Sequence, residues 1–247
     1  MKMGWTGLES AGKSQLMAVH STMVYARNVR WLKKRARLGL ESVPRTMAFD
    51  TPMSSTFIEK IKSRGLKYVH FRNLTEIEHL GDIDIFINEI NKYFPSRGSD
   101  PLTPQQEEYL TQGAKRGIDI YFCSQDFSQA HKRFRQLTNR MYYVVKMFGS
   151  IRPVPSAPPV NHIWGLALAW RLNPQSFNGD DASMRASGIS RLLPSPYWFN
   201  RTDCNLYDTS FIVPSTDLPP VYFAPRVSYY LDSNGQVVDT KTRYARK

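Results

Sequence analysis

The sequence predicts an α/β fold in which a mostly parallel β-sheet is flanked by helices. Three observations support this prediction. Short β-rich segments alternate with helical segments over residues 1–150. Two of these segments, 83–88 and 118–124, are almost continuously apolar, which is typical of parallel strands buried on both faces. A glycine-rich loop connects the first predicted strand to the first predicted helix.

The predicted elements follow in a regular order. Residues 2–6 are expected to form a strand. Residues 14–37 are expected to form a helix, because they lack proline and glycine and carry apolar residues at helical spacing. In the helix predicted over 104–116, Pro104 stands in the first turn, where proline is tolerated. The other predicted strands cover residues 45–50, 66–72, 83–88, 118–124 and 142–148, and the other predicted helices cover 54–64, 88–93 and 128–140.

The character of the chain changes after Gly149. Four prolines, at positions 153, 155, 158 and 159, form a stiff connector, and further prolines recur among aromatic residues beyond it. We therefore expect a core domain over residues 1–150. A Pro- and aromatic-rich C-terminal extension over residues 151–247, made of short strands and loops, is expected to follow and can pack on the core.

The composition limits the setting of the protein. Lysine and arginine number 33 against 21 acidic residues, a net charge of +12. This excess favours a polyanionic partner or an anionic membrane surface, although a basic enzyme without such a partner also fits. The two cysteines, Cys123 and Cys204, form no disulfide framework or recognisable metal site, which favours a reducing, intracellular setting. No apolar run is long enough for a signal peptide or a spanning helix, so we expect a soluble protein that is not secreted.

The loop after the first predicted strand matches the P-loop pattern G-x-x-x-x-G-K-[ST] in full. Glycines let successive backbone N–H groups converge on a phosphate, and the following helix directs its positive end at the same anion. We expect Lys13 to reach the β- and γ-phosphates and the Ser14 hydroxyl to bind Mg²⁺. A glycine turn without a ligand is the alternative. The predicted nucleotide-binding residues are Gly7, Leu8, Glu9, Ser10, Ala11, Gly12, Lys13, Ser14 and Gln15.

A second polar group follows the apolar segment 83–88. ATP hydrolysis at a P-loop needs an acid at the end of another buried strand, and Asn88 and Glu89 stand there. Glu89 is the candidate general base, and both residues are candidate Mg²⁺ ligands. Because Asn88 carries no charge, a lower Mg²⁺ affinity is expected. Glu89 capping a helix is the alternative. Asp82 and Asp84, which alternate with isoleucine, are expected to face solvent or a neighbouring subunit.

Gln125 ends the apolar segment 118–124. The carboxyl ends of parallel strands form the crevice in which ligands bind. An amide at this place can contact both the γ-phosphate and a water molecule. A surface glutamine without a function is the alternative.

The three motifs together, GLESAGKS, IFINEINKYFPSRG and AKRGIDIYFCSQDF, resemble the zonular occludens toxin-like proteins, which include filamentous-phage assembly ATPases. More distantly they resemble the FtsK/HerA superfamily of DNA-pumping ATPases. The resemblance covers residues 1–150. It implies a P-loop NTPase fold with a RecA-like sheet, ring-shaped homo-oligomers, ATP and Mg²⁺ as cofactors, hydrolysis between subunits, and phage DNA export or packaging.

The resemblance also implies roles for individual residues. Glu89 is the base and Gln125 the sensor of the γ-phosphate. Arg116 is the first candidate to reach a neighbouring subunit's γ-phosphate, and Arg97 is the second. The implied partners are DNA, contacted through its phosphate backbone, and virion or portal-type proteins. The implied location is the host cytoplasm or the virion.

Two features depart from this family. Asn88 replaces an acid, and the membrane-spanning helix of the filamentous-phage members is missing. The second departure favours a soluble genome-packaging motor, and peripheral membrane docking through another protein stays open. The alternative function is a nucleotide-binding scaffold for virion assembly with little or no hydrolysis. The replacement of an acid by Asn88 favours this alternative. A nucleotide or small-molecule kinase is a third candidate, which is disfavoured because the sequence contains no recognisable acceptor pocket or lid motif.

Two basic clusters are candidate DNA contacts. A solvated helix face is the equal alternative for the first cluster, since cations favour a helix C-terminus. The second cluster follows Gln125. The clusters are Arg27, Arg30, Lys33, Lys34, Arg35 and Arg37, and Lys132, Arg133, Arg135 and Arg140.

Overall fold

The predicted α/β fold is confirmed by a computed structural model, which describes residues 1–8, 11–41, 43–96, 103–149, 165–172, 194–199, 206, 230–231 and 237–238. Within these residues the helices are α1 (Lys13–Arg37), α2 (Ser55–Ser63), α3 (Pro104–Gln112) and α4 (Lys132–Gln136), with 3-10 turns η1 (Leu74–Glu76), η2 (Ile90–Lys92) and η3 (Phe127–Gln129). The strands are β1 (Lys2–Thr6), β2 (Thr46–Phe49), β3 (Lys67–His70), β4 (Ile83–Ile87), β5 (Asp119–Ser124), β6 (Arg140–Gly149), β7 (Gly165–Leu172), β8 (Ser195–Phe199), β9 (Tyr230–Leu231) and β10 (Val237–Val238).

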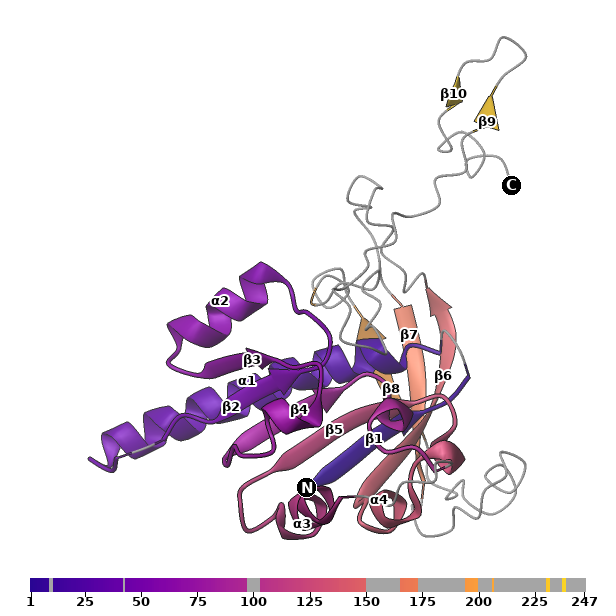
Figure 1. Ribbon diagram of the computed structural model, residues 1–247. Coiled ribbons are helices and arrows are strands. Elements are labelled where there is room, and N and C mark those ends of the chain that lie inside the picture. Colours follow the sequence, from indigo (N-terminus) through magenta and orange to yellow (C-terminus); the bar gives the residue numbers. More distant parts are fainter. Residues whose placement is uncertain are drawn as a thin grey trace.

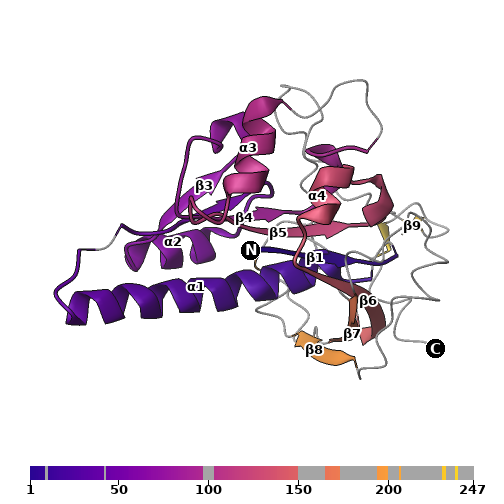
Figure 2. The ribbon, with the colours of Figure 1, turned by 90° about the horizontal axis from the view of Figure 1, so that it is seen from below.

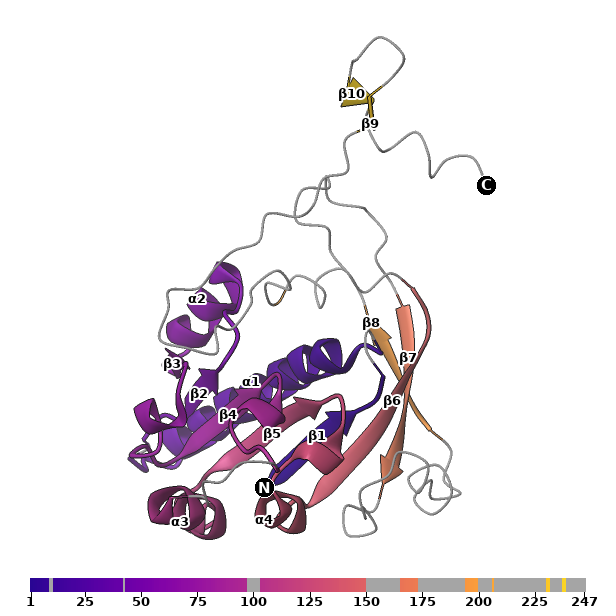
Figure 3. The same cartoon turned by 45° about the vertical axis from the view of Figure 1, so that its right-hand side comes forward.

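Eight of the described strands form one sheet, in the order β3-β2-β4-β5-β1-β6-β7-β8. The strands from β3 to β6 in this order pair in parallel, and β7 and β8 add in antiparallel orientation. Figure 3 shows this antiparallel end of the sheet beyond β6. Because β7 and β8 lie beyond residue 150, the core sheet continues into the predicted C-terminal extension. The division into two domains stays a prediction.

Helices cover both faces of the parallel part of the sheet (Figure 1 and Figure 2). On one face lie α1 and α2, whose Leu16 and Phe57 belong to one apolar cluster. On the other face lie α3 and α4, whose Leu110 and Phe134 belong to a second cluster. Every residue of β4 is buried between these layers, as the continuous apolar pattern predicts.

Local signals start two of the helices at their predicted positions. Ser54 caps α2 by accepting a hydrogen bond from the N–H of Phe57. Thr103 and Gln106 form a reciprocal capping box in front of α3, whose first residue is Pro104. Both helices therefore begin where a side chain accepts a hydrogen bond from one of the first backbone N–H groups.

Three helix predictions were too long. The helix predicted over 128–140 is replaced by η3 and the short α4, because Ala130 is extended and bridges Pro95, and because Arg140 already pairs with β1. The helix predicted over 88–93 is only the 3-10 turn η2. The helix α3 ends at Gln112, and Gly117, at φ 69°, turns the chain into β5.

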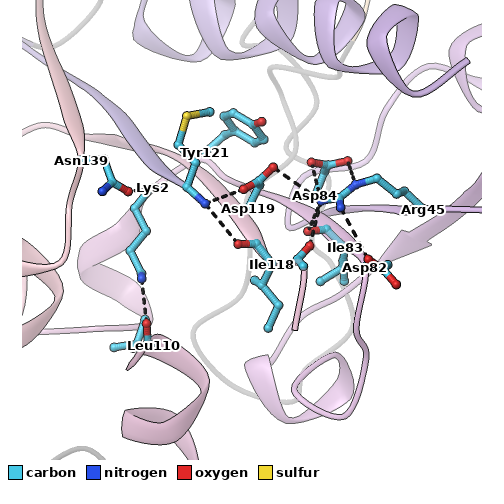
Figure 4. Close-up of polar contacts among 12 residues, drawn as sticks. Lys2, Arg45, Asp82, Ile83, Asp84, Leu110, Ile118, Asp119, Tyr121 and Asn139 are labelled. Atoms are coloured by element: carbon cyan, nitrogen blue, oxygen red, sulfur yellow. Dashed lines mark hydrogen bonds and ion pairs between the residues drawn. The ribbon is translucent and has the colours of Figure 1, made fainter. Parts of the chain in front are cut away.

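An ionic cluster lies at the amino edge of the sheet (Figure 4). Asp84 of β4 is fully buried. Its carboxylate accepts hydrogen bonds from Arg27 Nη2 at 2.8 Å, Asn28 Nδ2 at 2.7 Å and Arg45 Nε at 3.0 Å. The prediction that Asp84 faces solvent or a neighbouring subunit was therefore wrong, because two guanidinium groups of its own chain compensate its burial. Asp82 is exposed, and Arg45 approaches it at 3.7 Å.

The ring of His20 on α1 lies between two aromatic rings of the sheet. Its centroid is 5.3 Å from that of Trp5 and 5.0 Å from that of Tyr121. Burial lowers the pKa of His20 to about 4, the Arg27 and Arg140 charges act in the same direction, and Asp84 opposes them. His20 is therefore neutral in the folded protein at pH values where an exposed histidine takes up a proton.

We expect this histidine to make the fold less stable in acid. Its ordinary pKa is 6.5. As the pH falls from 6.5 towards 4, the unfolded chain binds a proton that the folded chain does not, at a cost of up to about 1.4 kcal/mol per pH unit. The buried Asp50, with a raised pKa, contributes the opposite slope. The measurement is therefore the difference in urea midpoint between the natural chain and His20→Asn, from pH 7 to pH 4.5. The difference is expected to shift in favour of His20→Asn as the pH falls, and parallel curves would refute this account.

Candidate functional site

The phosphate loop, Glu89 and Gln125 converge at the carboxyl edge of the parallel strands. Thr6 of β1 is in register with Ser124 of β5, so Gly7 and Gln125 follow neighbouring strand ends. On the other side of β5, Ile87 of β4 pairs with Phe122, which brings Glu89 to the same edge. Parallel sheets bind ligands at this edge.

The phosphate loop has the backbone geometry that its glycines predict. Gly7 has a φ of 151°, and a Cβ atom there would lie 2.5 Å from the Val144 carbonyl oxygen, so a side chain does not fit. Gly12, at φ 89°, is the N-cap of α1. The Ala11 N–H donates to the Leu8 carbonyl and closes the turn. Glu9 and Ser10 lie outside the described residues.

Lys13 and Ser14 open α1 directly beneath this loop. The Lys13 ammonium donates to the carbonyl oxygens of Gly7 at 2.8 Å and Leu8 at 2.7 Å. The Ser14 hydroxyl donates to Asn88 Oδ1 at 2.5 Å. The residue that replaces the expected acid therefore contacts the hydroxyl that is predicted to hold Mg²⁺.

A pocket of about 420 Å³ lies beside the loop. The Glu89 carboxylate lines it, and its Oε1 atom is buried with no hydrogen-bond partner among the described residues. Burial raises the pKa of Glu89, while the Gln125 backbone N–H and the Lys13 charge oppose this shift. A carboxylate with a raised pKa and a free oxygen beside a pocket is suited to accept a proton. The residues that line the pocket are Gly7, Leu8, Glu89, Asn91, Gln125, Asp126 and Gln129.

Of the remaining predicted residues, one lies at the pocket and the others do not line it. Gln125 lines the pocket, as expected from its strand end. Gln15 is buried, and neither of its amide atoms has a partner in the described part of the chain. Arg116 lies before β5, at the opposite edge of the sheet, where it donates to the Glu78 carbonyl at 2.7 Å. It does not contact the pocket of its own chain. Arg97 lies outside the described residues.

Sequence analysis missed Asp50, which follows β2 at the same edge. Its side chain is buried and accepts hydrogen bonds from the Asn88 N–H at 3.0 and 2.9 Å. Burial raises the pKa of Asp50 to about 7, although the Asn88 and Thr51 hydrogen bonds act against the shift. The available signal was an acid directly after a short apolar strand, the same signal that identified Glu89.

The donors at this edge fit a Mg²⁺–triphosphate. Mg²⁺ keeps several waters and takes few protein ligands besides substrate phosphates, and the Ser14 hydroxyl and Asn88 amide oxygen supply neutral oxygen donors side by side. Among the described residues, no group of three or more His, Cys, Asp or Glu could hold a metal ion by itself. None of the described helices combines the length and the hydrophobicity that a membrane-spanning segment requires.

Comparison with known proteins gives structural matches only. No protein-family model matches the sequence, and no curated protein shows significant similarity. The structure is similar to the N-terminal domain of zonular occludens toxin from Neisseria meningitidis, with a TM-score of 0.45 and 14% identity over 84% of this chain and 98% of that one. It is also similar to the genome packaging NTPase B204 from Sulfolobus turreted icosahedral virus 2, with a TM-score of 0.41 and 11% identity over 79% and 94%. A third match is the flagellar accessory protein FlaH from Methanocaldococcus jannaschii, with a TM-score of 0.40 and 13% identity over 70% and 77%.

Proposed function

We propose that this chain is a P-loop ATPase that couples ATP hydrolysis to the movement of viral DNA. The observation that carries the hydrolysis part is Glu89, which lines the pocket beside the phosphate loop and whose buried Oε1 atom has no hydrogen-bond partner among the residues that the structure describes. Such a group is poised to deprotonate an attacking water.

In this mechanism the loop and the start of α1 bind the phosphates through backbone N–H groups and the helix dipole. The Lys13 ammonium moves from the Gly7 and Leu8 carbonyls to the β- and γ-phosphates. Bound Mg²⁺ would neutralise phosphate charge, with Ser14 and Asn88 as its protein ligands. Glu89 takes the proton of the attacking water, and Gln125 contacts that water and the γ-phosphate.

The motor part of the proposal concerns assembly and DNA. Arg116 lies away from the pocket of its own chain. It can contact a γ-phosphate only in the pocket of a neighbouring subunit, as in a ring. Arg97 is the second candidate for this role. The C-terminal end of α1 extends past the sheet in Figures 1 and 2 and offers a sequence-independent contact to phosphate backbones. Its cations without an ion pair to any described residue are Arg30, Lys33, Lys34, Arg35 and Arg37, of which Arg35 donates to the Glu41 carbonyl. Virion or portal-type proteins are the expected further partners, in the host cytoplasm or the virion.

The proposal is tested by ATP hydrolysis of the full chain with Mg²⁺, with and without DNA, together with electron microscopy for a ring. Hydrolysis is expected to increase on adding DNA and to fall steeply with salt. An assembled ring that hydrolyses no ATP in the presence of DNA would refute the motor.

The variant Lys13→Ala is expected to weaken ATP binding about 10- to 100-fold, because hydrogen bonds to a charged group are worth about 1.5–3 kcal/mol. Binding of a fluorescent ATP analogue measures this effect. Lys132→Ala, which removes a lysine from α4, is the matched control and is expected to bind nucleotide normally. Equal affinity of Lys13→Ala and the natural chain would contradict the assignment of the loop.

The second candidate is a nucleotide-binding scaffold for virion assembly with negligible hydrolysis. Asn88 favours it, because an amide brings no charge to the Mg²⁺ side of the site. The two functions differ in one measurement: a scaffold binds ATP and assembles, but its phosphate release stays at the level of Glu89→Gln.

A further inference from the structure

We propose that Asp50 is a positioning residue of the nucleotide site, and that it supplies to the Mg²⁺ side the negative charge that Asn88 lacks. This inference rests on the proposed function. It adds a residue from the end of a fourth strand, β2, to a site that the sequence motifs place on β1, β4 and β5.

A chain of hydrogen bonds connects Asp50 to the phosphate loop. The Asp50 N–H donates to the Phe86 carbonyl at 3.1 Å, which fixes the end of β2 against β4. Both carboxylate oxygens of Asp50 accept from the Asn88 N–H, and Asn88 Oδ1 in turn accepts from the Ser14 hydroxyl. Asp50 therefore holds the backbone of the residue whose side chain contacts Ser14.

The same residues also surround a common space. Ser14, Asp50 and Asn88 line one small cavity between α1 and the ends of β2 and β4. The Thr51 hydroxyl also donates to the Asp50 carboxylate, at 3.0 Å. The carboxylate is thus fixed in orientation. It contacts one predicted Mg²⁺ ligand, Asn88, directly, and it is connected to the other, Ser14, through Asn88.

The burial of this acid needs an explanation. Asp50 is 2% exposed and forms no ion pair among the described residues. The Lys92 charge acts on it from a greater distance and offsets its burial only in part, since the pKa of Asp50 stays raised. A buried carboxylate without a direct ion pair is costly, whereas a neutral asparagine or serine could accept the Asn88 N–H just as well. A cation bound next to Ser14 would offset the cost, because the Coulomb interaction is strong where water is excluded. The acid is therefore suited to a site that holds a metal ion together with the nucleotide.

The test compares the affinity of a non-hydrolysable ATP analogue in Mg²⁺ and in EDTA, using the full chain. The natural chain is expected to bind more tightly in Mg²⁺. The variant Asp50→Asn keeps the size of the side chain and an oxygen that can accept the Asn88 N–H. In this variant the gain in affinity is expected to shrink by about tenfold, the lower end of the effect on metal affinity for residues that support metal ligands. Binding in EDTA is expected to stay within about twofold, since the phosphate loop is unchanged.

Rescue separates a charge effect from a structural one. Adding Asn88→Asp to Asp50→Asn returns the negative charge to the edge of the site and is expected to restore the Mg²⁺-dependent gain. Asp50→Ser provides a second variant if Asp50→Asn does not fold, as judged by thermal melting. An unchanged gain in the single variants, an equal loss in Mg²⁺ and EDTA, or a failed rescue would overturn the inference and leave the proposed function standing. If the natural chain binds no nucleotide in either condition, both are overturned.

Discussion

The variant Glu89→Gln is expected to bind ATP like the natural chain and to hydrolyse it about 10²- to 10⁴-fold more slowly, the range for loss of a general base. The glutamine amide has nearly the same shape and fills the same place in the pocket, but it cannot accept the proton of an attacking water. Steady-state phosphate release and binding of a fluorescent ATP analogue measure the two parts of this expectation.

A neighbouring carboxylate supplies the control. Asp126 lines the same pocket, but its side chain accepts a hydrogen bond from the Ser128 N–H at 2.8 Å and caps η3. Asp126→Asn keeps this cap and is expected to leave the hydrolysis rate within a few-fold. If both variants lowered the rate equally, the effect would come from the charge of the pocket and not from a base at Glu89.

The variant Asp84→Ala is expected to lower the free energy of unfolding by about 3–5 kcal/mol, the cost of breaking a buried ion pair by removing one partner. The variant leaves Arg27, Asn28 and Arg45 without the carboxylate that they share at the amino edge of the sheet. Asp119, at 3.6 and 3.5 Å from the two guanidinium groups, can compensate only in part. Urea unfolding followed by circular dichroism measures the loss.

Asp82→Asn is the matched control. Asp82 also lies at the amino edge, directly before β4, and contacts Arg45. Its side chain is 60% exposed, and asparagine tolerates its φ of 49°. An exposed ion pair contributes about 0–1 kcal/mol, so a small change is expected. A loss below about 1 kcal/mol in Asp84→Ala would mean that the arginines find other partners, and that the cluster does not hold β4 to α1 and β2.

Local patterns predicted much of the fold and part of the site. The phosphate loop could be identified because its chemistry depends on backbone conformation within a few residues, which Gly7 and Gly12 encode. Glu89 and Gln125 could be placed together because parallel strands bring their carboxyl ends to one edge. The length of α4 could not be predicted, because Arg140 already belongs to strand β6 and pairs with β1, which is far away in the chain.

The sequence by itself determined a parallel α/β sheet, the phosphate loop and the acid beside it, because each depends on a short run of residues. Only the tertiary structure decided that Asp84 is buried, that Asp50 holds Asn88, and that Arg116 lies away from its own pocket. The partners of Asp84 are 39 to 57 residues distant along the chain, and Asp50 is 38 residues from Asn88. An aspartate between isoleucines predicts a solvent-facing side chain as long as the arginines that pair with it are not known. The free energy of a buried charge depends on those distant partners, which no local pattern contains.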